Sequence, residues 1–122
     1  IKKVGKRSDH HINGAKISEE ILNKYNYPQE KIKRVKNCVL HHRTSFDAEN
    51  KEEVCVSDAD ILSHFDNIPM IFDYAYKNYD VNLSNIRSFI KRYFENDYND
   101  LSDKTRVIFK EEYENIMNVL FK

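Results

Sequence analysis

The 122-residue sequence contains few of the residues that interrupt regular secondary structure, with only two glycines and two prolines. A sheet protein needs many tight turns, and glycine and proline are common in them. Their scarcity therefore favours long helices. The two cysteines are too few for a disulfide framework, so we expect them to be reduced, buried thiols in a cytoplasmic protein.

The sequence also lacks a long apolar run and an excess of charge of one sign. No segment approaches the ~20 apolar residues that span a bilayer, and no secretory signal is visible. Twenty Lys and Arg residues balance twenty Asp and Glu residues. A net charge of zero gives no general attraction to nucleic acid, so any affinity for phosphate has to be local. We therefore expect neither a membrane nor polymeric nucleic acid as a partner.

The hydrophobic spacing predicts an all-α protein, an irregular bundle of about five helices. Pro69 falls inside the third helix and should kink it or split it. Residues 43–53 are polar and without a period, which predicts a loop, and residues 96–100 are predicted to form a turn. The helices are predicted to begin at Ser8 or Asp9, at Pro28, near Val54–Ser57, at Asn82 and at Ser102.

One of the two glycines, Gly14, lies inside the first predicted helix, one turn after His10. A glycine in a helix interior costs about 1 kcal/mol relative to alanine. Such a glycine usually permits the close approach of another backbone or of a ligand. We therefore expect His10 to face a crowded side of this helix.

Histidines and aspartates gather around the second and third predicted helices. His41 and His42 end the second helix, Asp58 and Asp60 open the third, and a further pair, His10–His11, lies on the first. A short loop folds the third helix back, so we expect His41, His42 and Asp60 to meet at one end of a helix pair. Imidazole nitrogens and carboxylate oxygens form a suitable ligand set for a divalent metal. A single histidine would be interpreted as structural, but two pairs with an aspartate favour a site.

Three motifs in this order carry a resemblance to a known family: His10–Ala15, Val39–Arg43 and Asp58–Asp60. The chain resembles the HD-domain superfamily of metal-dependent phosphohydrolases, and the resemblance covers most of its length. It implies that Asp60 is the final metal-ligand aspartate and that His10 is the first auxiliary histidine. It further implies that the pair His41–His42 binds a second metal or the phosphate.

The resemblance also implies an activity and a cofactor. The full-length protein would hydrolyse a small phosphorylated substrate, a phosphomonoester or a nucleotide, with a divalent metal (Mn, Fe, Mg, Co, Ni or Zn) that polarises the phosphoryl oxygens. Arg43, Lys6 and His11 are the candidate contacts to the substrate phosphate. His64, four residues after Asp60, is interpreted as structural first and as a ligand second.

The chain departs from the family at its N-terminal side. The His-Asp dipeptide that names the family does not occur, no histidine precedes His10, and the first residue is Ile1 rather than Met. We therefore expect residues 1–122 to be a single HD-like domain that lacks its N-terminal helices. A missing helix exposes apolar surface, which favours a homodimer.

Two alternatives stay open. In the first, the chain is a catalytically incomplete HD-like helical module that acts as a regulatory or partner-binding domain. In the second, it holds a structural zinc site built from Cys38, His42 and Cys55 with His10 or His11. The Cys-x-x-Cys spacing typical of small zinc folds is absent, which ranks the zinc site lower.

Overall fold

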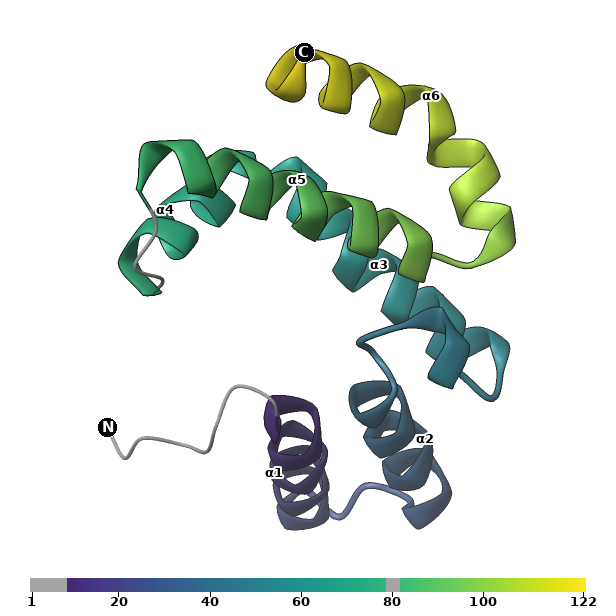
Figure 1. The fold of residues 1–122 in the computed structure, drawn as a ribbon. Coiled ribbons are helices and arrows are strands. Elements are labelled where there is room, and N and C mark those ends of the chain that lie inside the picture. The colour runs from purple at the N-terminus through teal and green to yellow at the C-terminus, as the bar shows by residue number, and fades with distance from the viewer. Residues whose placement is uncertain (1–8, 79–81) are drawn as a thin grey trace. The chain divides into compact units, whose positions relative to one another are not determined.

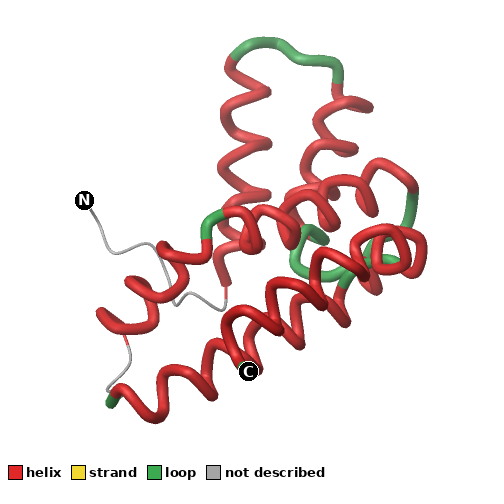
Figure 2. The backbone as a smooth tube through the Cα atoms, turned by 90° about the horizontal axis from the view of Figure 1, so that it is seen from above, coloured by secondary structure: helices red, strands yellow, loops and turns green. Residues whose placement is uncertain are grey.

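The computed structural model describes residues 9–78 and 82–122, and within these residues it contains six α-helices and no strand (Figures 1 and 2). The all-α prediction is therefore confirmed. No helix in these two ranges is long and apolar enough to cross a membrane. The helices are α1 (His10–Lys24), α2 (Gln29–Leu40), α3 (Lys51–Asp66), α4 (Ile68–Asn78), α5 (Leu83–Asp100) and α6 (Asp103–Phe121), and a short 3-10 helix spans Ser45–Asp47.

The chain divides into two compact units, Ile1–Asp58 and Ala59–Lys122, and the division falls inside α3. The first unit contains α1, α2 and the start of α3. The second contains the rest of α3 with α4, α5 and α6. That all 122 residues form one HD-like domain stays a prediction.

In the first unit, α1 and α2 lie side by side (Figure 1). Ala15 and Ile32 are its buried apolar residues, each 2% exposed. A Cβ atom added to Gly14 would lie 3.1 Å from Val39 Cγ1. Since most Cβ contacts are longer than this, the glycine allows the two helices to approach closely. The group that approaches Gly14 is thus the Val39 side chain rather than the backbone or ligand predicted.

The start of α3 differs from the prediction. The helix begins at Lys51, about one turn before the start predicted near Val54–Ser57. Asn50 Oδ1 accepts a hydrogen bond from the backbone N–H of Glu53 at 3.0 Å, which satisfies a free donor of the first helical turn. An Asn followed three residues later by a Glu is a known helix-start signal. The polar residues of this turn carry no hydrophobic period, so the spacing of apolar residues did not reveal it.

The break predicted near Pro69 is confirmed, because α3 ends at Asp66 and α4 begins at Ile68. This split produces six helices in the described chain rather than about five. The predicted turn at residues 96–100 is wrong, because α5 continues to Asp100. Side chains of this last stretch are held by other helices: the Tyr98 ring stacks on that of Tyr113, with centroids 3.9 Å apart.

Side-chain caps begin the last two helices as predicted. Asn82 accepts from the backbone N–H of Asn85, and Ser102 accepts from that of Thr105. In the second unit, the aromatic ring of Phe65 contacts those of Phe94 and Phe109 at centroid distances of 4.9 and 5.1 Å. The buried apolar core of this unit consists of Ile61, Phe65, Ile71, Ala75, Ile86, Ile90, Phe94 and Leu101.

Candidate functional site

The imidazoles of His10 and His42 face each other in the first unit. Their Nε2 atoms are 3.0 Å apart and their ring centroids 5.0 Å apart. His10 is the first residue of α1, and His42 lies two residues after the end of α2. The side-by-side packing of these helices therefore brings together two histidines that are 32 residues apart in the sequence.

Hydrogen bonding assigns the tautomer of His42. Its Nδ1 atom lies 2.5 Å from the backbone oxygen of Val39. A carbonyl oxygen can only accept, so Nδ1 carries the proton of this hydrogen bond, and the lone pair of the corresponding tautomer is on Nε2, which faces His10. Histidines that bind metals usually have this arrangement, with the other ring nitrogen bonded to a carbonyl or carboxylate.

His11 and Arg43 lie close to this pair. The rings of His10 and His11 are 5.7 Å apart, and the buried Nδ1 atom of His11 has no hydrogen-bond partner among the described residues. Burial lowers the pKa of His11 below its ordinary value, and the neighbouring charges of Arg43, His10 and His42 lower it further. We call His10, His11, His42 and Arg43 the imidazole cluster. Within this cluster, the Arg43 guanidinium and a ring N–H of His11 can donate to an anion such as phosphate.

The other member of the pair at the end of α2, His41, bonds to a carboxylate. Its Nδ1 atom is 2.7 Å from Glu53 Oε2, which also accepts from the backbone N–H of Glu49 at 2.9 Å. Asn50 Nδ2 donates to the other carboxylate oxygen at 2.6 Å. Burial of Glu53 raises the pKa of its carboxyl group, but these hydrogen bonds outweigh burial and leave the pKa below its ordinary value. Glu53 was missed in the sequence because it lay in the predicted loop.

The remaining predicted site residues are placed as follows. Asp60 belongs to the second unit, where its charge contributes to raising the pKa of Asp97. Asp58 is buried in the first unit, at 7% exposure. Lys6 lies outside the described residues. The metal set of Asp60 with His10, His41 and His42 therefore stays a prediction.

The described residues contain no group of three or more His, Cys, Asp or Glu side chains placed to hold a metal ion. The alternative zinc site of Cys38, His42 and Cys55 is thus not formed, and Cys55 is exposed rather than buried as predicted. The pair His10–His42 does fit two positions of a coordination sphere. Metal–nitrogen bonds of about 2.0–2.1 Å place two ligand nitrogens roughly 3 Å apart, as they are here.

His64 is the histidine of the second unit, and it also bonds to a carboxylate. Its Nδ1 atom lies 2.8 Å from Asp97 Oδ2 and 3.2 Å from the hydroxyl oxygen of Tyr93. Burial raises the pKa of Asp97, the hydrogen bond from His64 opposes that rise, and the nearby charge of Asp60 adds to it. The structural interpretation of His64 agrees with these contacts.

No protein-family model, curated protein or solved structure matches this chain. The HD-domain resemblance therefore depends on the three sequence motifs. The chemistry is argued below from the imidazole cluster, since function is carried by sites rather than by folds.

Proposed function

We propose that the chain is the metal- and phosphate-binding part of a metal-dependent phosphohydrolase of the HD type, acting on a small phosphomonoester or nucleotide. The observation that carries this proposal is the convergence of His10 Nε2 and His42 Nε2 at 3.0 Å. The carbonyl of Val39 supports it, because the bond that it accepts from Nδ1 leaves the ring's lone pair on Nε2, the nitrogen that a metal would use.

The metal ligands are then His10 and His42, with Asp60 added from the motif resemblance. A divalent metal bound there supplies a Lewis acid and a bound water of lowered pKa. Which of Mn, Fe, Mg, Co, Ni or Zn is preferred depends on the complete ligand set. Imidazole nitrogens favour the later transition metals, and the carboxylate of Asp60 would broaden that choice.

The neighbouring side chains bind and orient the phosphate. The Arg43 guanidinium donates charge-assisted hydrogen bonds to phosphate oxygens. His11 is held neutral by burial and its basic neighbours, so one ring nitrogen donates without adding charge. Glu53 accepts a hydrogen bond from the Nδ1–H of His41 and thereby leaves the other nitrogen of that ring available, as the predicted second-metal or phosphate role requires.

Two further parts of the proposal concern the location of the protein in the cell and its oligomeric state. Free Cys38 and exposed free Cys55 fit a reducing cytoplasm. A homodimer would cover apolar side chains of α1, since Ile12, Ile17 and Ile21 are 41%, 46% and 48% exposed.

Metal binding by the purified chain tests the proposal. We expect near-stoichiometric Mn²⁺ or Zn²⁺ binding by calorimetry, at least about tenfold weaker in His10→Ala and His42→Ala. His64→Ala is the matched control, because it removes an imidazole outside the cluster and should leave binding intact. Equal weakening in all three variants, or no binding in the wild type, would contradict the proposal.

The catalytically incomplete module is the second candidate, and the absence of a three-ligand group in the described residues favours it. Hydrolysis of p-nitrophenyl phosphate and of nucleoside monophosphates separates the two candidates. Metal-dependent turnover that is lost in His42→Ala supports the enzyme. Metal binding without turnover supports the module.

A further inference from the structure

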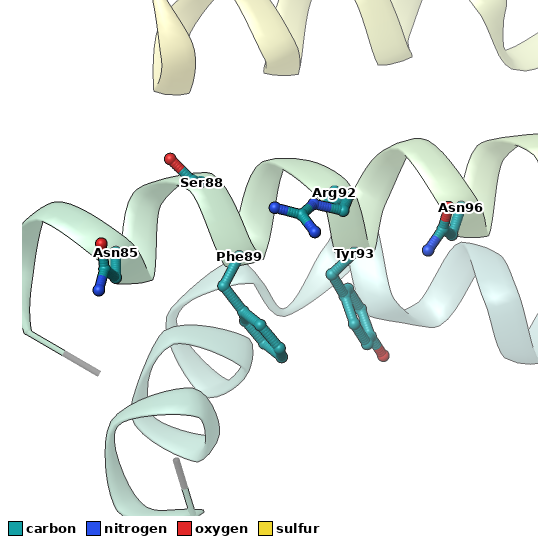
Figure 3. Close-up of a pocket in the computed structure, with 6 residues that line it drawn as sticks. All are labelled: Asn85, Ser88, Phe89, Arg92, Tyr93 and Asn96. Atoms are coloured by element: carbon teal, nitrogen blue, oxygen red, sulfur yellow. The ribbon is translucent and has the colours of Figure 1, made fainter. Parts of the chain in front are cut away.

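A cavity lies in the second unit, along α5, and it has a volume of about 420 Å³ (Figure 3). This volume is within the range of small-molecule sites. The lining residues are spaced three or four apart, so they share one side of the helix. They are Asn85, Ser88, Phe89, Arg92, Tyr93 and Asn96, which we call the α5 pocket.

Two aromatic rings form one wall of the α5 pocket. Phe89 and Tyr93 are one turn apart and project from the same side of the helix (Figure 3). The hydroxyl of Tyr93 is 3.2 Å from His64 Nδ1, which is bonded to Asp97, and its ring packs edge-on against Phe94. These contacts hold the Tyr93 ring in one orientation before any ligand arrives. A pre-oriented aromatic wall favours stacking of a planar ring.

The polar side of the α5 pocket contains an exposed arginine. Among the described residues, Arg92 makes no ion pair or hydrogen bond, and its guanidinium lies between the two aromatic side chains and Ser88 (Figure 3). Two other cations of α5 are engaged: Arg87 donates to the backbone oxygen of Lys122 at 3.0 Å, and Lys91 pairs with Glu95. A planar guanidinium without a partner suits a phosphate or carboxylate group.

Two amides complete the α5 pocket. The side chains of Asn85 and Asn96 are exposed at its two ends (Figure 3). Each amide offers a carbonyl acceptor and an NH₂ donor, the pair of functions that reads the edge of a heteroaromatic ring. The α5 pocket thus combines an anion contact, stacking surfaces and donor–acceptor groups.

We propose that the α5 pocket binds a small anion that carries a planar heteroaromatic ring, the chemistry of a nucleoside monophosphate. The ring packs against Phe89 and Tyr93, and the anionic group pairs with Arg92. The site lies in a different unit from the imidazole cluster, uses none of its residues and needs no metal. It therefore stands independently of the proposed hydrolase function.

Calorimetric titration of the full chain with AMP, in the presence of EDTA, tests this site. We expect saturable binding of one AMP, weakened at least about tenfold in Arg92→Gln through loss of the charged contact and several-fold in Phe89→Leu. Arg87→Gln is the matched control on the same helix and should bind AMP as the wild type does.

Two further probes separate the parts of the ligand. Adenosine and inorganic phosphate should each bind at least about tenfold more weakly than AMP, because each lacks one of the two contacts. The proposal is overturned if the wild type does not bind AMP at millimolar concentration, or if either fragment binds as tightly as AMP. It is equally overturned if Arg87→Gln weakens binding as much as Arg92→Gln does.

Discussion

His42 differs from His41 and His64 in what its Nδ1 atom contacts. His41 in the first unit and His64 in the second bond to carboxylates, at 2.7 and 2.8 Å. His42 instead bonds to the backbone carbonyl of Val39, and its other nitrogen faces His10. A buried carboxylate ties its histidine to the stability of the fold, whereas a carbonyl orients the ring without burying a charge. Either partner leaves the other ring nitrogen available, and His42 is the better ligand candidate because its Nε2 atom faces a second imidazole.

The two carboxylate partners also differ from each other. Glu53 is fully buried and accepts three hydrogen bonds, which lower its pKa. Asp97 is less completely buried, and its pKa is raised. The difference teaches that burial alone does not set the direction of the shift. The number of donors that the surrounding backbone and side chains supply decides it.

Replacing Glu53 should produce the largest loss of stability. Glu53→Ala leaves the N–H groups of Glu49, Asn50 and His41 without their acceptor, and we expect a loss of about 3 kcal/mol in the free energy of unfolding. Urea unfolding followed by circular dichroism measures it. Glu52→Ala is the neighbouring control, because the Glu52–Arg34 ion pair is exposed and should contribute less than about 1 kcal/mol. Equal losses of stability in Glu53→Ala and Glu52→Ala would contradict the structural role of Glu53.

The acid dependence of stability should have opposite signs at the two carboxylates. Glu53 has a folded pKa below its ordinary 4.5, so its contribution is complete above that pH and is lost as the pH falls through the folded pKa. Asp97 has a folded pKa above its ordinary 3.8, so its burial destabilises the fold at neutral pH, and this penalty is relieved as the pH falls toward 3.8.

Unfolding of Glu53→Gln and Asp97→Asn at several pH values between about 3 and 7 measures these slopes. The stability difference between wild type and Glu53→Gln should shrink on acidification. On acidification, the wild type should become more stable relative to Asp97→Asn. Slopes of the same sign would show that the two histidine–carboxylate pairs are electrostatically alike.

Removing a buried hydroxyl that has no partner should have the reverse effect on stability. Ser57 is fully buried, and its Oγ has no hydrogen-bond partner among the described residues. We expect Ser57→Ala to stabilise the chain by about 1 kcal/mol, because the unpaired hydroxyl no longer has to be desolvated. In Ser63→Ala, the control, the lost hydroxyl donates to the backbone oxygen of Asp60, so no gain is expected. A destabilised Ser57→Ala protein would mean that the hydroxyl has a partner.

The smallest effect concerns the contact that brings His10 and His42 together. Gly14→Ala adds a Cβ 3.1 Å from Val39 Cγ1, so we expect a net loss of about 0.5 kcal/mol despite the higher helix propensity of alanine. In a Val39→Ala background the clash is absent, and the same substitution should stabilise by about 0.5–1 kcal/mol. A double-mutant cycle in urea measures the difference. If the effects of Gly14→Ala and Val39→Ala on stability simply add, α1 and α2 are not in close contact at Gly14.

Much of the fold was predictable because it depends on local signals. Apolar spacing located the helices, and Asn82, Ser102 and Pro69 marked two starts and the break. The last turn of α5 was missed because Asp97 and Tyr98 are held helical by residues far away in sequence, His64 and Tyr113. No local pattern reports such contacts.

For the candidate site, the sequence predicted which histidines take part but not which side chains contact each other. The sequence indicated that histidines gather where α1 begins and α2 ends, and the structure brings His10 and His42 together there. The sequence assigned His41 and His42 to one site, whereas the structure gives them different partners, because neighbouring residues at a helix end point in different directions. The partner of His41, Glu53, was hidden in a polar turn whose cap at Asn50 went unrecognised.

Nitrogen-15 NMR of the histidine side chains, with and without Zn²⁺, tests the central claim most directly. Without metal, we expect His42 to carry its proton on Nδ1. On addition of one equivalent of Zn²⁺, the Nε2 resonances of His10 and His42 should shift together and saturate, while those of His64 stay unchanged. A His42 ring protonated on Nε2, or zinc-induced shifts no larger at His10 and His42 than at His64, would contradict the account.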